Sequence, residues 1–236
     1  MTTLIGSSVG LSVTMGPPAA GLEQGQFGIG ADYTYSHLSL EMDEGTSSIG
    51  PVSRFIADPV RTDVLAARAG YGVRDYLEVT GLLGGVRGRT GDSDDRFSGD
   101  GLAYGFGAKA TLRKQERLTW GGLFQMAWYD IDGKWRGVGW SGDADIEFWQ
   151  IQVAAGPTYR LCDHASIYGG PFWQCIDGEK TYKEPGYHER YDVDPTSNFG
   201  GYFGARINPF ARTGLDVEFQ FTEDDTAIGV NLIRQL

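Results

Sequence analysis

The stretch "VEFQFTEDDTAIGVNLIRQL", residues 217–236, alternates apolar and polar side chains on both sides of an acidic break. The large apolar residues take every second position before and after that break: Val217, Phe219, Phe221, Ile228, Val230 and Leu232. Successive side chains of a β-strand point to opposite faces, so this spacing gives a ribbon with one apolar face. The pattern predicts a terminal β-hairpin with a two-residue turn at Asp224 and Asp225, in which Phe221 faces Ile228.

Composition points to an all-β protein for the whole chain. Of 236 residues, 36 are glycine and 13% are aromatic, a combination that disfavours helical bundles. The net charge of −11 argues against nucleic acid as a partner. No apolar run approaches the ~20 residues of a transmembrane helix. Residues 1–25 lack the basic start and solid apolar segment of a signal peptide, so we expect an N-terminal extension that is flexible or plugs a lumen.

The terminal ribbon is the last of about ten predicted strands in residues 26–236. Alternation and turn residues place them at 26–41, 61–73, 75–87, 101–113, 117–131, 145–161, 164–177, 197–208, 211–223 and 226–236. Several exceed the usual strand length and match the ~9–11 residues that cross a bilayer. Pro157 and Pro171 fall inside these strands and require bulges or strand ends there. The final strand is expected to pair with 26–41 and close a barrel.

The connections between these strands alternate in length. Short ones lie near 72–75, 113–116, 161–164 and 208–211, whereas 42–60, 88–101, 132–145 and 177–197 are long and polar. This alternation is typical of an antiparallel up-and-down transmembrane β-barrel with short periplasmic turns and long extracellular loops.

The two faces of the predicted strands differ in a way that suits such a barrel. The apolar face carries aromatic residues towards strand ends, as in the interfacial girdles of membrane barrels. These candidate interface aromatics are Tyr33, Tyr35, Trp120, Trp128, Trp149 and Tyr159. The opposite face is rich in Gly, Ser, Thr and Gln, and its charges have both signs, which would neutralise each other inside a narrow lumen. The predicted lumen network is Asp32, Arg68, Glu78, Lys109, Arg160, Arg206, Asp216 and Glu218.

On these features the chain resembles the bacterial outer-membrane β-barrel superfamily, of the small single-chain kind. The amphipathic end of the chain carries the most local part of this resemblance. Members typically finish on such a strand with an aromatic last residue, where this sequence has Leu236. The resemblance implies a place in the Gram-negative outer membrane, with outer-membrane lipid, lipopolysaccharide and other envelope proteins as partners.

Motifs for chemistry are sparse. Asp92, Asp94, Asp95 and Asp100 lie in one acidic stretch that does not fit the EF-hand spacing, so we expect a solvated loop with at most weak cation binding. His188 lies near acidic residues but in no catalytic spacing, and Cys162 and Cys175 are expected to be isolated thiols. We therefore expect neither a cofactor nor enzymatic activity.

Four functions remain open on the sequence alone. The first is a non-enzymatic barrel with a structural or surface-interaction role and a polar lumen mostly filled by side chains. The others are a narrow porin for small solutes, a rim hydrolase that is omptin-like or lipid-modifying, and a soluble ligand-binding barrel with its apolar face inside.

Overall fold

The computed structural model describes residues 13–42, 45–47, 50–52, 55–91, 96–137, 140–184, 187–194, 198–223 and 225–236. These residues form one antiparallel sheet of thirteen strands. The strands are β1 (Phe27–Met42), β2 (Gly45–Ser47), β3 (Gly50–Val52), β4 (Phe55–Arg74), β5 (Leu77–Gly91), β6 (Arg96–Lys114), β7 (Leu118–Gly137), β8 (Trp140–Cys162), β9 (Ala165–Glu184), β10 (Tyr187–Asp194), β11 (Phe199–Phe210), β12 (Thr213–Phe221) and β13 (Thr226–Gln235). The described part of the chain has no helix that could cross a membrane.

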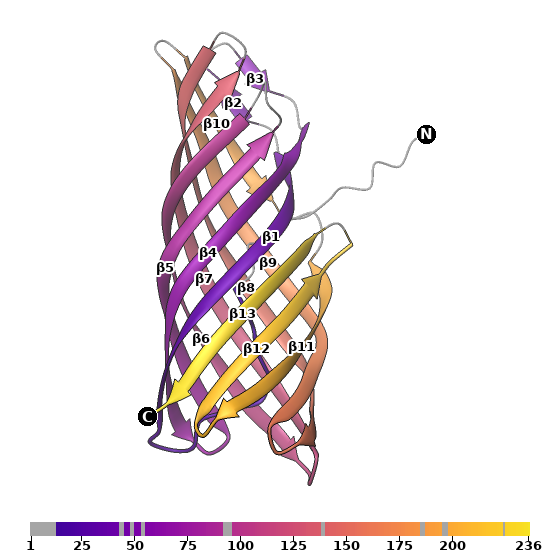
Figure 1. Cartoon of the computed structure of the whole chain (residues 1–236). Coiled ribbons are helices and arrows are strands. Elements are labelled where there is room, and N and C mark those ends of the chain that lie inside the picture. Colours follow the sequence, from indigo (N-terminus) through magenta and orange to yellow (C-terminus); the bar gives the residue numbers. More distant parts are fainter. Residues whose placement is uncertain are drawn as a thin grey trace, which may run out of the picture.

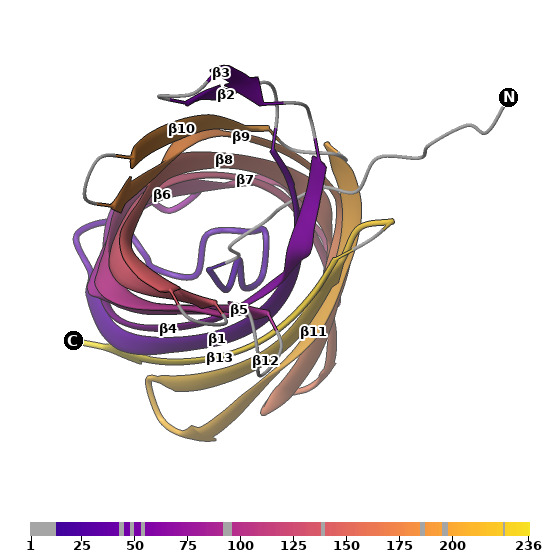
Figure 2. The ribbon, with the colours of Figure 1, turned by 90° about the horizontal axis from the view of Figure 1, so that it is seen from above.

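Ten of these strands close into a barrel, as the sequence predicts. The first strand pairs with the last, from Gly28↔Gln235 to His37↔Thr226, and β9 pairs with β11. Figure 1 shows the tilted strands of the wall, and Figure 2 shows the closed ring from above. At the upper end of the wall β10 lies between β9 and β1 and pairs with both, and β2 and β3 continue the sheet from β10.

The terminal hairpin forms, but its predicted register is wrong by two residues. Phe221 pairs with Thr226, and Phe219 rather than Phe221 pairs with Ile228. The connection is longer than two residues because Thr222 and Asp225 bind each other, the Thr222 N–H donating to the Asp225 carbonyl at 3.0 Å. A shift of two residues preserves the side-chain parity, so the apolar residues still share one face.

All four stretches predicted as long loops are mostly strand. The stretch 42–60 contains β2, β3 and the start of β4, and within 88–101 β5 runs to Gly91 and β6 begins at Arg96. Within 132–145 the strand β7 runs to Gly137 and β8 begins at Trp140, while 177–197 contains the end of β9 and all of β10. Opposite charges on neighbouring strands support these extensions: Lys183 donates to Asp145 at 2.9 Å, and Arg190 pairs with Glu179. The hydrogen bond with Asp145 raises the pKa of Lys183.

Pro157 of β8 and Pro171 of β9 both lie where the β8–β9 ladder is interrupted. The pairing reads Ala154↔Phe172 and resumes at Thr158↔Tyr168, with no change of register across the interval. Proline has no N–H to donate, which accounts for an interruption at this point. The predicted bulge or strand end is therefore replaced by a short unpaired interval inside two continuous strands.

The apolar face of the wall points outward. Large apolar side chains stand on the outside with much of their surface exposed, among them Leu65 at 63%, Leu83 at 59% and Phe203 at 57%. Their inward neighbours, such as Ala66, Thr34 and Tyr202, are buried. An exposed apolar wall of this extent requires lipid around it, which contradicts the soluble barrel with an apolar interior.

Candidate functional site

The inner wall near the short turns is polar and charged. Asp32 on β1, Arg68 on β4, Glu78 on β5, Lys109 on β6, Arg206 on β11, and Asp216 and Glu218 on β12 belong to it. Arg206 binds Asp216 with two hydrogen bonds, of 2.6 and 2.7 Å. Asp32 accepts from Arg68 at 2.5 Å and from Asn231 at 2.7 Å. The structure thus brings seven of the eight predicted lumen charges to one zone of the barrel.

The eighth predicted lumen residue, Arg160, does not join this group. Its side chain is exposed, and its guanidinium donates to the Glu116 carbonyl at 2.7 Å. Arg160 lies two residues from the end of β8, beside a register irregularity between Arg160 and Cys162. At that rim the long side chain reaches the neighbouring turn instead of the lumen, so this part of the prediction is wrong.

The N-terminal segment, residues 13–25, lies inside the barrel (Figure 2). Two buried carboxylates hold its backbone at two places. Glu218 accepts hydrogen bonds from the N–H groups of Met15 and Gly16, both at 2.8 Å. Glu78 accepts from the N–H groups of Gly21 at 2.8 Å and Leu22 at 3.2 Å. Each carboxylate therefore satisfies two neighbouring backbone donors that have no ladder partner.

Carbonyl groups of the segment are bound by side chains of the wall as well. Arg68 donates to the Thr14 carbonyl at 2.8 Å, while the Thr14 hydroxyl donates to Asp32. The amides of Gln125 and Gln220 both donate to the Val13 carbonyl at 3.2 Å. The segment is held by charge-assisted and amide hydrogen bonds from several strands, and these positions are polar for that reason.

Glycines create the room that the segment occupies. A Cβ atom on Gly121 of β7 would lie 2.4 Å from the Ala19 nitrogen, and one on Gly72 of β4 would lie 1.9 Å from the Glu23 carbonyl oxygen. Gly16 has a φ of 71°, in the left-handed region that glycine adopts without strain. At the exit, Gly25 donates to Gly72 at 2.8 Å and aligns the chain with β1.

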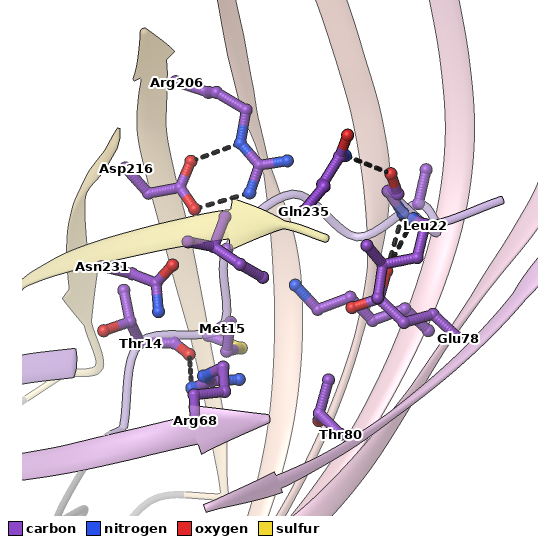
Figure 3. A pocket seen from close by; sticks show the side chains of 15 residues that line it. Thr14, Met15, Leu22, Arg68, Glu78, Thr80, Arg206, Asp216, Asn231 and Gln235 are labelled. Atoms are coloured by element: carbon purple, nitrogen blue, oxygen red, sulfur yellow. Dashed lines mark hydrogen bonds and ion pairs between the residues drawn. The ribbon is translucent and has the colours of Figure 1, made fainter. Parts of the chain in front are cut away.

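Little space remains beside the segment. The cavity between it and the charged wall has a volume of about 30 Å³ and is lined by residues of both (Figure 3). A cavity of this size has room for one or two water molecules. At this level the lumen is occupied by the segment itself.

The inner wall further from the short turns is mainly apolar, with Lys180 and Gln150 buried among its apolar side chains. The alternation of the sequence does not predict this zone. Side chains that point inward there are buried and form one cluster with Val13 of the segment. Its larger members are Phe97, Tyr129, Ile131, Ile146, Phe148 and Ile176. A Cβ atom on Gly133 would meet the Phe97 ring at 2.5 Å, which shows how closely this layer is filled. The interior therefore has a polar zone with the segment and an apolar layer beyond it.

The predicted interface aromatics all lie on the outward face. Tyr33, Tyr35, Trp120 and Tyr159 are exposed, and Trp128 and Trp149 are partly covered where they pair across β7 and β8. The Tyr33 hydroxyl donates to Asp63 at 2.7 Å. Tyr104, not among the predicted residues, stacks on Trp128 with ring centres 5.5 Å apart.

The candidate cation residues do not form a site in the described part of the chain. Asp92, Asp94 and Asp95 lie outside the described residues, and Asp100 pairs with Arg87 at 2.5 Å. No group of three or more His, Cys, Asp or Glu residues suited to a metal ion occurs within the described ranges. The side chain of His188 also lies outside the description. Cys162 and Cys175 lie on different strands, with Cys175 paired to Ile151 far along β8.

Comparison with known proteins supports the fold. No protein-family model and no curated protein sequence matches the chain. Among solved structures, the translocator domain of the autotransporter NalP from Neisseria meningitidis is 9% identical with a TM-score of 0.51, covering 91% of this chain and 89% of that one. The outer membrane protease OmpT from Escherichia coli is 11% identical with a TM-score of 0.47, covering 96% and 97%. The outer membrane protein OprG from Pseudomonas aeruginosa is 10% identical with a TM-score of 0.48, covering 92% and 98%.

Proposed function

We propose that the chain is a non-enzymatic barrel whose lumen is closed by its own N-terminal segment and that it serves a structural or surface-interaction role. It has the fold of bacterial outer-membrane β-barrels, and its apolar outer wall suits that membrane. Outer-membrane lipid and lipopolysaccharide are its proposed partners, together with other envelope proteins.

The hydrogen bonds between the barrel wall and residues 13–22 support this proposal. Two buried carboxylates and Arg68 bind the segment backbone, and about 30 Å³ remains beside it. A solute passage would need a continuous wet path, whereas this level is filled and the next layer is apolar. Both features favour a closed barrel over a channel.

A planar-bilayer recording on the full-length protein tests the proposal. Flat current traces are expected after insertion, which is verified independently by the slower gel mobility of the barrel after heating. Discrete conductance steps from the unmodified protein would overturn the closed-barrel proposal and establish the narrow porin. The porin is the second candidate because the inner wall is polar and carries charges of both signs.

A further inference from the structure

The outer wall has an apolar depression near its turn-side edge. Its volume is about 870 Å³, and it crosses β13, β1, β4 and β5. The floor consists of small side chains that lie next to one another in the ladder, with Ala31 paired to Ala67 and Ala69 paired to Gly81. Ile29, Leu83 and Leu232 stand around it with about half of their surface exposed. The lipid-facing wall is therefore hollowed where a hydrocarbon chain would lie against it.

The depression runs from the edge of the barrel into the membrane. One register row passes through Arg234, Ile29, Ala69, Gly81 and Phe106. Arg234 is one residue from the turn-side end of β13, whereas Phe106 is eight residues from the turn-side end of β6. Because the strands are tilted, a row perpendicular to them climbs from the interface towards the bilayer centre.

The row begins at the turn-side edge of the barrel with a positively charged residue, Arg234. Arg234 is exposed on the outward face, beside Thr213 and Ile29 in the ladder, and Phe210 lines the depression next to it. Within the described ranges its guanidinium has no hydrogen-bond or ion-pair partner. A charged group on a lipid-facing wall is costly unless it reaches the interface and meets an anion there.

We propose that this depression binds an anionic phospholipid, with an acyl chain on the small-residue floor and the phosphate on Arg234. The order of these features matches that of a phospholipid: the cation lies at the membrane edge, where the phosphate would be, and the apolar depression leads inward from it, where the acyl chain would be. Short turns mark the periplasmic side of such barrels, where the surrounding leaflet consists of phospholipid. A guanidinium and a phosphate form a charge-assisted, bidentate pair.

Native mass spectrometry of the full-length protein in a neutral detergent, titrated with phosphatidylglycerol, tests this site. We expect a one-to-one complex with phosphatidylglycerol and clearly weaker binding of phosphatidylcholine. Arg234→Gln removes the charge and should weaken phosphatidylglycerol binding about tenfold. Gly81→Leu should weaken it too, because a Cβ atom there meets no atom within 4 Å and the larger side chain fills the hollow without distorting the wall.

Arg117→Gln is the matched control. Arg117 is exposed at the same end of the barrel, in the β6–β7 connection and away from the depression, so its loss should leave lipid binding unchanged. Heat-dependent gel mobility confirms that each variant still forms the barrel. Equal binding by all three variants would overturn the proposal, as would preferential binding of lipopolysaccharide. A dimer that Gly81→Leu abolishes would also overturn it, because a second copy would then occupy the depression.

Discussion

At the scale of single residues, the interior is organised by carboxylates that take the place of missing strand neighbours. Glu218 and Glu78 each accept from two consecutive backbone N–H groups of the N-terminal segment. Buried backbone donors without partners would destabilise the structure, so these side chains decide where the segment can lie. Alternation along a strand is enough to predict that such residues point inward. It cannot predict which backbone they bind, since Glu218 and Met15 lie on opposite ends of the sequence.

Glu218→Gln should loosen the first part of the segment. The substitution replaces one of two acceptor oxygens by an NH₂ group, so either Met15 or Gly16 faces a donor instead of an acceptor. Hydrogen exchange at these two amides should become about tenfold faster, the factor expected when a hydrogen bond to a charged group is lost. Glu223→Gln, at an exposed position outside the strands, is the control. Unchanged exchange in Glu218→Gln would mean that Glu218 does not hold the segment.

At the scale of elements, the strands and their faces are predicted well from the sequence where one face of the strand meets lipid and the other meets a polar lumen. The terminal strands fit this condition, and there even the error of two residues in the hairpin keeps the faces correct. The prediction fails around Ile131 and Ile146, which pair across β7 and β8 and point into the apolar layer. The outward side chains next to them are charged, among them Asp132 and Lys134, and the inward position between those two is Gly133. The stretch 132–145 is therefore polar and rich in glycine, and it is mistaken for a loop.

The N-terminal segment is an element without secondary structure, and its fit depends on the wall glycines. Gly121→Ala should displace residues 18–19, because the added Cβ would lie 2.4 Å from the Ala19 nitrogen and 2.5 Å from the Pro18 carbonyl carbon. Such overpacking costs about 1–3 kcal/mol, enough to free a segment held by a few hydrogen bonds. Limited proteolysis should then cut near these residues in Gly121→Ala but not in the native protein.

Gly122→Ala provides the matched control for that experiment. Gly122 is the next residue of β7 and belongs to the other face, and its nearest atoms to a new Cβ lie at 3.7 and 3.9 Å. This variant should keep the segment protected. Cleavage to the same extent in both variants would show that the segment is accessible without any steric displacement.

At the scale of the whole molecule, the barrel is closed at two successive levels. The first is the polar zone with the N-terminal segment, and the second is the buried apolar layer around Phe97, Ile131 and Ile146. A polar lumen follows from the sequence because inward charges of both signs recur on several strands. The apolar layer does not, because its residues are separated along the chain and gather only when the wall closes.

Removing the segment alone should therefore leave the barrel without conductance. A protein lacking residues 1–22 keeps the apolar layer, and a narrow apolar constriction excludes ions because water does not remain in it. Ile131→Ser and Ile146→Ser, made together, place hydroxyl groups on two paired inward positions of that layer. Planar-bilayer recordings should give flat traces for the truncated protein and for the double substitution, and conductance steps only when both changes are combined. Steps from the truncated protein alone would show that the segment is the sole barrier and that the apolar layer lets ions pass.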